Sequence, residues 1–314
     1  MPDGKGVVIG GGTMGAGIAA MFVASGQDVD VVEPNVAARA SLVERVNRAA
    51  IEIGRKEPLG RVRALAAIGE IDWQGVTLVV EAVLESLELK REIFAALEAA
   101  APRDIPLTSN SSGFPITRIA EGMATAERML GLHFFMPAHL VPCVEVICGE
   151  RSDRAVAESV VAMTRGLGKK PVLVRKDIPG FLGNRLQAAI MREALHLVEN
   201  GYASIEDIDT VSRYSFGFRL AAAGPLLQKD ISGLRSVVVS HATMYPSLSN
   251  ATEPSVILRD LVAAGKSGVQ AREGFYRWTD ETAAAELARY DRAIQKALAI
   301  LREEDEAAGR RELD

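Results

Sequence analysis

The sequence predicts an α/β domain with a parallel sheet, followed by a domain built only of helices. Short apolar segments that are typical of buried strands alternate with helical segments over residues 1–176. A glycine-rich turn joins the first of these strands to the first helix. From Asp177 onward the pattern contains helices and no strong strand. We therefore expect two domains, residues 1–176 and residues 177–314.

The composition limits the kinds of partner that this chain could have. At 314 residues, with 25% charged and 48% hydrophobic residues, the sequence is typical of a soluble globular protein. A net charge of −5 argues against nucleic acid or an anionic membrane as a partner. No apolar run approaches the roughly 18 residues that span a bilayer. The N-terminal sequence enters a strand without a signal-peptide core, so we expect a cytoplasmic protein.

The two cysteines and four histidines do not form a recognisable metal site. Cys143 and Cys148 are five positions apart on what reads as one extended segment, too far from each other to form a disulfide. We expect both thiols to be reduced core residues, as in cytoplasmic proteins. No cysteine or histidine cluster has metal-ligand spacing, so no metal is expected.

The glycine-rich turn has the G-x-G-x-x-G spacing of a dinucleotide site. It follows the apolar strand 5–9 and opens a helix that ends before Gly26. Gly10 permits a tight turn, Gly12 lets the backbone approach a pyrophosphate, and Gly15 lets helix and strand pack closely. Thr13 and Met14 begin the helix, whose free N–H groups attract phosphate. The sequence thus predicts a Rossmann-like domain.

An acidic residue stands where such a domain holds the ribose of its cofactor. The second strand, 28–32, runs directly into Glu33. Its carboxylate can accept hydrogen bonds from the ribose hydroxyls and would repel a 2′-phosphate. We therefore expect NAD in preference to NADP. The alternative is a glycine-rich turn with a purely structural purpose.

The segment GLHFFMPAHLVPCVE, residues 131–145, contains the strongest candidates for catalysis. His133 follows an apolar run, two prolines break the chain, and Glu145 lies on the apolar strand that comes next. A carboxylate on a buried strand needs a polar partner. If it binds one nitrogen of His133, it fixes the tautomer and raises the basicity of the other nitrogen, as in a general base. The alternative is that the two side chains never meet.

A third polar group follows the strand 105–110. Ligands bind at the carboxyl ends of the strands of an open parallel sheet, so Asn110, Ser111 and Ser112 are expected near the cofactor. They could instead form a polar turn and a helix cap before Pro115.

Periodicity and breakers predict the remaining elements of both domains. A polar helix is expected after Pro58, and a stripe of Leu287, Tyr290, Ile294, Leu298 and Leu301 predicts an amphipathic C-terminal helix that packs on its own domain. Further strands are expected at 77–81, 129–133 and 171–175, and helices at 35–53, 86–100, 154–167, 203–211, 225–240 and 254–264, with another after residue 181.

Several spaced motifs together resemble the L-3-hydroxyacyl-CoA dehydrogenase family. Its relatives include L-gulonate 3-dehydrogenase (lambda-crystallin), L-carnitine dehydrogenase and a pyridine-carboxylate dehydrogenase. The resemblance covers about Lys5 to Trp278 and rests on the segments IGGGTMGAGIA, VVEAVLESLELK, TSNSSGFPIT, GLHFFMPAHLVPCVEVI, KDIPGFLGNRLQ and EGFYRW.

The resemblance implies an activity and a role for individual residues. The reaction would be the reversible NAD-dependent oxidation of a hydroxy group β to a carboxyl group or thioester. The implied homodimer would form through the helical domain, which would also contribute to the substrate cleft. The implied roles are His133 as catalytic base, Glu145 as its partner, Ser112 and Asn184 as contacts to the reacting oxygen, and Glu85, Lys90 and Asn110 beside the nicotinamide half of NAD.

Two departures from the acyl-CoA members bear on the substrate. Met136 stands where those members usually carry asparagine, and the region 35–73 is short, with Lys56 as its single lysine, where they have a lysine-rich hairpin that touches CoA. In the segment SFGFRLAAAGP, Arg219 stands where the gulonate enzyme also has a basic residue. An arginine suits a free carboxylate, although it could equally form a structural salt bridge. The sequence slightly favours a free hydroxy acid over an acyl-CoA such as 3-hydroxybutyryl-CoA.

Two other functions are compatible with parts of the sequence. The 6-phosphogluconate and hydroxyisobutyrate dehydrogenases share the glycine-rich start, but they use a catalytic lysine in a K-x-x-N arrangement, where this chain has GFLGNR. A non-enzymatic NAD-binding protein would need none of His133, Glu145, Ser112 and Asn184.

Overall fold

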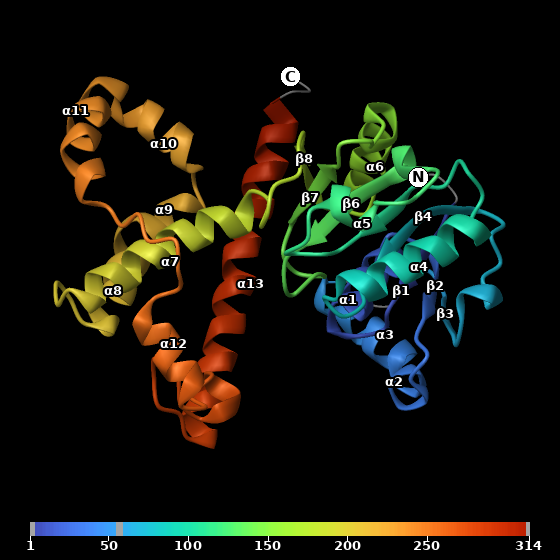
Figure 1. The fold of residues 1–314 in the computed structure, drawn as a ribbon, viewed down its shortest axis with the longest axis horizontal. Helices are drawn as coiled ribbons and strands as arrows, with labels where there is room; N and C mark the ends of the chain where they lie inside the picture. The colour runs from blue at the N-terminus through green and yellow to red at the C-terminus, as the bar shows by residue number, and fades with distance from the viewer. Residues whose placement is uncertain (1–3, 55–58, 312–314) are drawn as a thin grey trace. The chain divides into compact units, whose positions relative to one another are not determined.

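The computed structural model describes residues 4–54 and 59–311 (Figure 1). Contacts within the chain divide it into two compact units, Met1–Leu186 and Gln187–Asp314. The division falls within helix α7 (Gly183–Glu199), so the first turn of this helix belongs to the first unit. The domain limits 1–176 and 177–314 stay a prediction.

The first unit is built on an eight-stranded sheet in the order β3-β2-β1-β4-β5-β6-β7-β8. All neighbouring strands are parallel except β6 and β7, which form an antiparallel pair. Because β1 is central and the chain moves outward from it on both sides, the carboxyl ends of β1 and β4 meet at a topological switch point, where such sheets bind ligands. The strands are β1 (Lys5–Ile9), β2 (Asp28–Val32), β3 (Val62–Leu65), β4 (Val76–Glu81), β5 (Leu107–Ser109), β6 (Met129–Phe134), β7 (Cys143–Cys148) and β8 (Lys170–Val174).

Helices cover both faces of this sheet, so its strands are apolar on both sides. Neighbouring residues of β1 point to opposite faces: Val8 belongs to one buried cluster and Val7 to the other. The first cluster includes α1 (Thr13–Ala24), α3 (Leu42–Glu52) and α6 (Arg154–Gly166). The second includes α4 (Leu87–Ala100) and α5 (Ile116–Ile119). The predicted Rossmann-like architecture is confirmed.

The helix expected after Pro58 was wrong for the described part of that segment. Pro58 itself lies outside the described residues, and the chain after it forms β3 and a short 3₁₀ turn, η1 (Ile68–Glu70). The physical reason is pairing with β2: Arg61 bonds to Asp28, and Arg63 bonds to Asp30. Arginines at alternating positions thus lie along the edge of a sheet and not on an exposed helix.

The helix expected over residues 35–53 is two helices, α2 (Val36–Ala40) and α3. Ser41 separates them and is both the C-cap of α2 and the N-cap of α3. Its hydroxyl donates to the carbonyl of Ala38 and accepts from Arg45. A serine that bonds to nearby backbone competes with the regular helical bonds and favours such a break.

The second unit is helical, as expected, and its described residues contain only isolated bridges between residues 268 and 273 and between 273 and 277. The helix expected over 225–240 is divided at Gly233, which has a φ of +92°. Leu287 and Tyr290 of the tail stripe are exposed, whereas Leu298 is buried. The elements after α7 are α8 (Ile205–Val211), the π-helix η3 (Ser212–Gly217), α9 (Phe218–Leu220), α10 (Pro225–Ser232), α11 (Leu234–Met244), η4 (Tyr245–Ser247), α12 (Val256–Ala263), η5 (Val269–Ala271) and α13 (Asp280–Arg311); η2 (Ala126–Arg128) belongs to the first unit.

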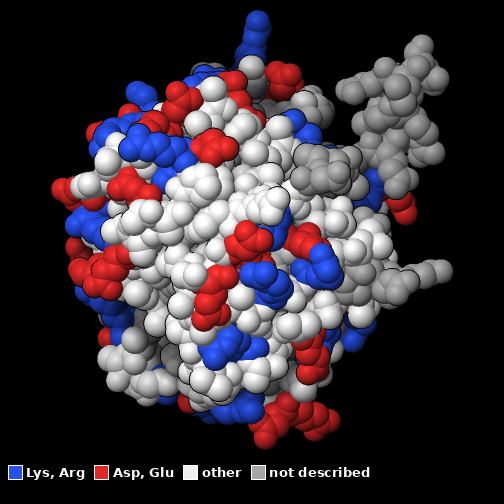
Figure 2. Space-filling view, turned by 90° about the vertical axis from the view of Figure 1, so that its right-hand side faces the viewer, with Lys and Arg blue, Asp and Glu red and all other residues white. Residues whose placement is uncertain are grey.

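The surface drawn in Figure 2 carries acidic and basic side chains interspersed with each other. Such mixing gives no extended field of one sign, in line with the modest net charge of −5. Within residues 4–54 and 59–311, no helix has both the length and the continuous apolar character needed to cross a bilayer.

Candidate active site

His133 and Glu145 meet on neighbouring strands of the sheet. The chain turns back between β6 and β7, and the antiparallel register places the two residues directly opposite each other. The distance from His133 Nδ1 to Glu145 Oε2 is 2.8 Å, and both residues are buried. An ionised carboxylate only accepts hydrogen bonds, so Nδ1 carries a proton and donates a hydrogen bond to Glu145. This leaves Nε2 of His133 as an acceptor.

The second oxygen of Glu145 lies at the start of helix α7. Glu145 Oε1 accepts hydrogen bonds from the backbone N–H groups of Leu182 and Gly183, both at 2.9 Å. Burial is the largest influence on this carboxyl group and raises its pKa, but the hydrogen bonds from His133, Gly183 and Leu182 together outweigh it. The net pKa of Glu145 is lowered, and the side chain stays ionised at neutral pH.

Two aromatic rings contact the imidazole of His133. The ring of Phe135 lies 4.7 Å from it between centroids, in an edge-to-face arrangement. The ring of Phe181 lies 5.5 Å away and is completely buried. Aromatic neighbours at these distances restrict the orientation of the imidazole ring.

The glycine-rich turn lies beside a cavity of about 630 Å³ at the carboxyl ends of β1, β2 and β4. A Cβ atom added at Gly12 would meet nothing within 4 Å, so the backbone there is open to a ligand. Helix α1 begins at this turn and has no side-chain cap, which leaves its first N–H groups free to bind phosphate. These features fit a dinucleotide. The cavity is lined by Ile9, Gly10, Gly12, Thr13, Met14, Val32, Glu33, Pro34, Ala66, Ala67, Ile68, Ala82, Val83, Leu84, Leu89 and Ile93.

Glu33 is fixed beside this turn. Its Oε2 accepts from the backbone N–H of Gly11 at 2.9 Å, and its Oε1 accepts from the N–H of Asn35 at 2.8 Å. Each carboxylate oxygen has a further lone pair, so both can still accept from ribose hydroxyls. The carboxylate lies on the wall of the cavity, as the cofactor assignment requires.

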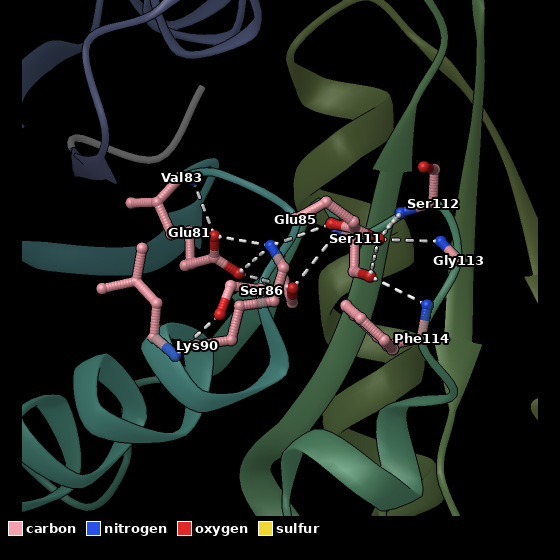
Figure 3. Close-up of polar contacts among 11 residues, drawn as sticks. Glu81, Val83, Glu85, Ser86, Lys90, Ser111, Ser112, Gly113 and Phe114 are labelled. Atoms are coloured by element: carbon pink, nitrogen blue, oxygen red, sulfur yellow. Dashed lines mark hydrogen bonds and ion pairs between the residues drawn. The ribbon is translucent and has the colours of Figure 1, made fainter. Parts of the chain in front are cut away.

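A network of charged side chains, of which Lys90 and Glu81 are buried and Glu85 is partly exposed, lies at the carboxyl ends of β4 and β5 (Figure 3). The ammonium group of Lys90 is 1% exposed and binds both oxygens of Glu81, at 2.9 and 3.0 Å, and one oxygen of Glu85 at 3.3 Å. Glu81 also accepts from the Ser109 hydroxyl at 2.6 Å. Two carboxylates therefore surround Lys90, whose charge is compensated inside the protein.

Glu85 connects this network to the turn that follows β5. Its Oε1 accepts from the Ser111 hydroxyl at 2.6 Å and from the N–H groups of Ser112 and Gly113 at 3.1 and 2.9 Å (Figure 3). Burial, the largest influence, raises the pKa of Glu85, but the hydrogen bonds from Ser111 and Gly113 and the charge of Lys90 lower it overall. An ionised Glu85 thus holds the Ser111–Gly113 turn in place.

Comparisons with known proteins place this geometry in a family. The 3-hydroxyacyl-CoA dehydrogenase NAD binding domain matches residues 5–178, and the C-terminal domain of the same family matches residues 180–278. The chain belongs to the 3-hydroxyacyl-CoA dehydrogenase family. It is an NAD-dependent dehydrogenase that acts on CH–OH groups.

Individual relatives cover nearly the whole chain. The chain is 31% identical to a 5-formyl-3-hydroxy-2-methylpyridine 4-carboxylate 5-dehydrogenase of Mesorhizobium japonicum, over 94% of this chain and 97% of that protein. It is 35% identical to the human mitochondrial hydroxyacyl-coenzyme A dehydrogenase, over 86% of this chain and 90% of the other. A crystal structure of a dehydrogenase for the same pyridine carboxylate, described as an NAD⁺-dependent dismutase, superposes with a TM-score of 0.85 at 30% identity and covers 96% and 98% of the two chains.

In this dehydrogenase, most of the predicted site residues lie at the carboxyl ends of the parallel strands. Asn110 accepts from the N–H of Phe134, next to His133, at 2.8 Å. Asn184 follows Gly183 in the first turn of α7. Ser112 is exposed on the turn held by Glu85, and the side chains of Ser112 and Asn184 make no hydrogen bond within the described residues. Among the side chains that the structure describes, in residues 4–54 and 59–304, no group of three or more metal-binding residues occurs.

Arg219 belongs to the second unit and is described there alone. It lies on α9, its side chain is exposed, and its Nε donates to the carbonyl of Ser215 at 2.9 Å. Its two terminal nitrogens have no partner in the described part of the chain, so they remain available to a ligand.

Sequence reasoning missed two parts of this site. Glu81 ends an apolar strand, the same signal that identified Glu145, and could have been found by it. The backbone donors Leu182 and Gly183 have no such signal, because any residue except proline has an N–H group. Their role follows only from the position of α7.

Proposed function

We propose that this dehydrogenase oxidises the hydroxy group of a free carboxylic acid, with His133 as general base and Glu145 as its partner. The observation that carries the proposal is the hydrogen bond of 2.8 Å between His133 Nδ1 and Glu145, which leaves Nε2 able to accept a proton. Both side chains are buried at the carboxyl edge of an NAD-binding sheet.

The residues of the chain then have defined tasks in the reaction. Nε2 of His133 takes the proton of the substrate hydroxyl, while the ionised Glu145 stabilises the imidazolium that forms. NAD, when bound, supplies the acceptor for the hydride that leaves the carbinol carbon. General-base assistance of this kind is worth roughly 10²- to 10⁴-fold in rate. Ser112 and Asn184 would donate hydrogen bonds to the reacting oxygen and stabilise charge there.

The cofactor would lie along the carboxyl edge of the sheet. Gly10, Gly12 and Gly15 would admit the pyrophosphate, which the N–H groups of Thr13 and Met14 would bind. The adenosine ribose would bind to Glu33. Asn110, Glu85 and Lys90 would lie beside the nicotinamide half; the ion pairs of Lys90 support an indirect role for its charge.

The substrate class rests on the structural comparison. The relative with a TM-score of 0.85 is named for a free pyridine carboxylate, and it matches this chain over 96% of its length. The alternative is an L-3-hydroxyacyl-CoA substrate, which the 35% identity to the human mitochondrial enzyme favours. The uncommitted terminal nitrogens of Arg219 suit a carboxylate.

A steady-state assay with NAD tests both the activity and the class. The panel contains free 3-hydroxy acids, L-carnitine, pyridine carboxylates with hydroxymethyl or formyl groups, and 3-hydroxybutyryl-CoA. We expect turnover of a free acid, and His133→Ala should remove most of kcat while NADH affinity stays near that of the wild type. Efficient turnover of 3-hydroxybutyryl-CoA alone would show that the substrate is an acyl-CoA and not a free acid.

Arg219→Met tests the carboxylate contact itself. A hydrogen bond to a charged group is worth about 1.5–3 kcal/mol net, so KM for the free acid should rise about 10- to 150-fold. An uncharged ester analogue should be affected much less. Arg213→Met, an exposed arginine of the same unit whose cation lies over Tyr214, is the matched control and should change KM little. Equal effects of the two variants would exclude Arg219 as a substrate contact.

We further propose that the second unit forms a homodimer and that the protein is cytoplasmic. Large apolar side chains stand exposed on α10 and α11, including Leu226 at 85% and Ile231 at 75%. Such side chains mark an interaction surface. Ile231→Asp should convert dimers to monomers in light scattering after gel filtration, whereas the exposed Lys229→Ala should not.

The free thiols of Cys143, which is half-buried, and Cys148, which is buried, support a reducing compartment.

A further inference from the structure

Phe181 has a backbone conformation that is rare for its residue type. Its φ is +48°, in the left-handed region, and its side chain is completely buried. Gly180, the preceding residue, also has a positive φ, of +76°. A bulky residue persists in this region only where its surroundings hold it there, and such outliers cluster at functional sites.

The left-handed turn at Gly180 and Phe181 determines where the next two N–H groups point. Those of Leu182 and Gly183 converge on one oxygen atom, Oε1 of Glu145, at the same distance of 2.9 Å. With Oε1 held in this way, Oε2 of the same carboxylate faces Nδ1 of His133 at 2.8 Å. The turn therefore fixes the rotation of the Glu145 carboxylate.

The same residue also contacts the base directly. The Phe181 ring lies 5.5 Å from the His133 imidazole, with 56° between the ring planes. One strained residue thus acts on both members of the pair, through its backbone on Glu145 and through its ring on His133.

We propose that the Gly180-Phe181 turn is a positioning element of the general base: its conformation directs two backbone donors onto Glu145, and this keeps the proton of His133 on Nδ1. The proposal rests on the proposed function of His133. Gly180 and Phe181 act through Glu145 and through the orientation of the His133 ring, so both are positioning residues.

Gly180→Ala disturbs the turn without crowding it. A Cβ atom at Gly180 would come no closer than 3.5 Å to its neighbours, so the only penalty is the positive φ. Gly122→Ala is the matched control, because Gly122 has a φ of +86° in the same unit and open space around its Cβ position. Both variants should lower Tm to a similar extent. Only Gly180→Ala should lower kcat, by about tenfold, with the Kd of NADH unchanged.

Nitrogen-15 NMR of the histidines provides a readout that does not depend on turnover. The His133 signal is identified by its loss in His133→Ala. In the wild type and in Gly122→Ala it should show one tautomer with the proton on Nδ1, whereas in Gly180→Ala it should show a mixture of tautomers. If Gly180→Ala does not fold, Phe181→Leu takes its place; this variant keeps the apolar bulk but removes the ring, and it should lower kcat and broaden the His133 signal.

The outcomes separate this inference from the proposed function. An unchanged His133 tautomer together with an unchanged kcat in both turn variants would overturn the inference, as would equal losses of kcat in Gly180→Ala and Gly122→Ala. If the wild type oxidises no member of the substrate panel, the proposed function fails, and the tautomer comparison still decides whether the turn positions His133.

Discussion

At the scale of single residues, the carboxylate of Glu33 sets the choice of cofactor. Two backbone N–H groups, from Gly11 and Asn35, hold it at the wall of the cofactor cavity. A 2′-phosphate would face this negative charge, and the side chain could turn away only by giving up its two hydrogen bonds. Like charges that face each other at an interface cost several kcal/mol.

We therefore expect the enzyme to prefer NAD over NADP strongly. A difference of about 3 kcal/mol corresponds to a factor of about 150 in kcat/KM. Glu33→Gln should reduce this factor at least about tenfold, because the like-charge repulsion is gone. Glu44→Gln removes an exposed carboxylate of α3 and is the charge-matched control. Equal kcat/KM values for the two cofactors in the wild type would contradict the assignment.

Glu85 is the residue for which the structure and the family resemblance suggest different tasks. The resemblance implies a contact with the nicotinamide half of NAD, whereas the structure shows Glu85 holding the turn that carries Ser112. The two tasks predict different kinetics. A direct cofactor contact affects NAD binding, while a turn that positions Ser112 affects the chemical step.

Because of these contacts, Glu85→Gln should lower kcat about tenfold and leave the Kd of NADH within about twofold. The variant loses the charge that holds Lys90 and the turn together. Glu88→Gln, which removes an exposed carboxylate from the first turn of α4, should change neither value. A large rise in the Kd of NADH with kcat intact would show that Glu85 acts on the cofactor directly.

At the scale of elements, two glycines of the glycine-rich turn are needed for different reasons. Gly15 lets α1 approach β1: a Cβ atom there would lie 1.8 Å from the carbonyl oxygen of Gly10, so backbone would collide with side chain. Gly12 has nothing within 4 Å of its Cβ position, so the protein itself does not require a glycine there. The remaining reason for Gly12 is the ligand.

The two alanine substitutions should therefore fail in different ways. Gly12→Ala should keep Tm close to that of the wild type and raise the Kd of NADH at least about tenfold. Gly15→Ala should lower the free energy of unfolding by about 2 kcal/mol or more, since packed backbone must move. Thermal unfolding and NADH fluorescence titration measure both effects. Normal NADH binding by Gly12→Ala would show that the cofactor does not bind at this turn.

At the scale of the whole molecule, several carboxylates link stability to pH. The pKa values of Glu85, Glu98 and Glu145 are lowered in the folded protein relative to 4.5. For each of them burial is the largest influence and acts in the opposite direction, and hydrogen bonds outweigh it. A lowered folded pKa stabilises the fold above the unfolded value, and this contribution is lost as pH falls through the folded value.

Tm should accordingly change little from neutral pH down to about pH 5 and fall steeply as the pH drops below 4.5. Circular dichroism melts across this range measure the effect. Glu145→Gln should make the decline less steep, since one of the linked groups no longer titrates. A Tm that stays constant down to about pH 3 would show that these hydrogen bonds do not contribute to stability in this way.

Much of the fold was readable from local signals in the sequence. The glycine spacing, the apolar strands and Glu33 predicted the Rossmann-like unit because each depends on neighbouring residues alone. Glu145 could be matched to His133 because a carboxylate on an apolar strand needs a partner, and few polar groups were close enough along the chain to supply one.

Other features were decided by contacts between distant segments. The strand β3 depends on pairing with β2, which lies more than thirty residues earlier in the chain. The local sequence of β3 therefore did not indicate whether it forms a strand or a helix. The burial of Lys90 depends on Glu81 and Glu85 together. The donors to Glu145 come from a turn that the sequence marks with Pro179 and Gly180, but nothing in those residues shows which side chain the turn faces. The sequence by itself determined which chemical groups are present and in which order. Only the tertiary structure decided how the backbone of one segment presents its N–H groups to the side chain of another, because every residue type but proline carries the same donor.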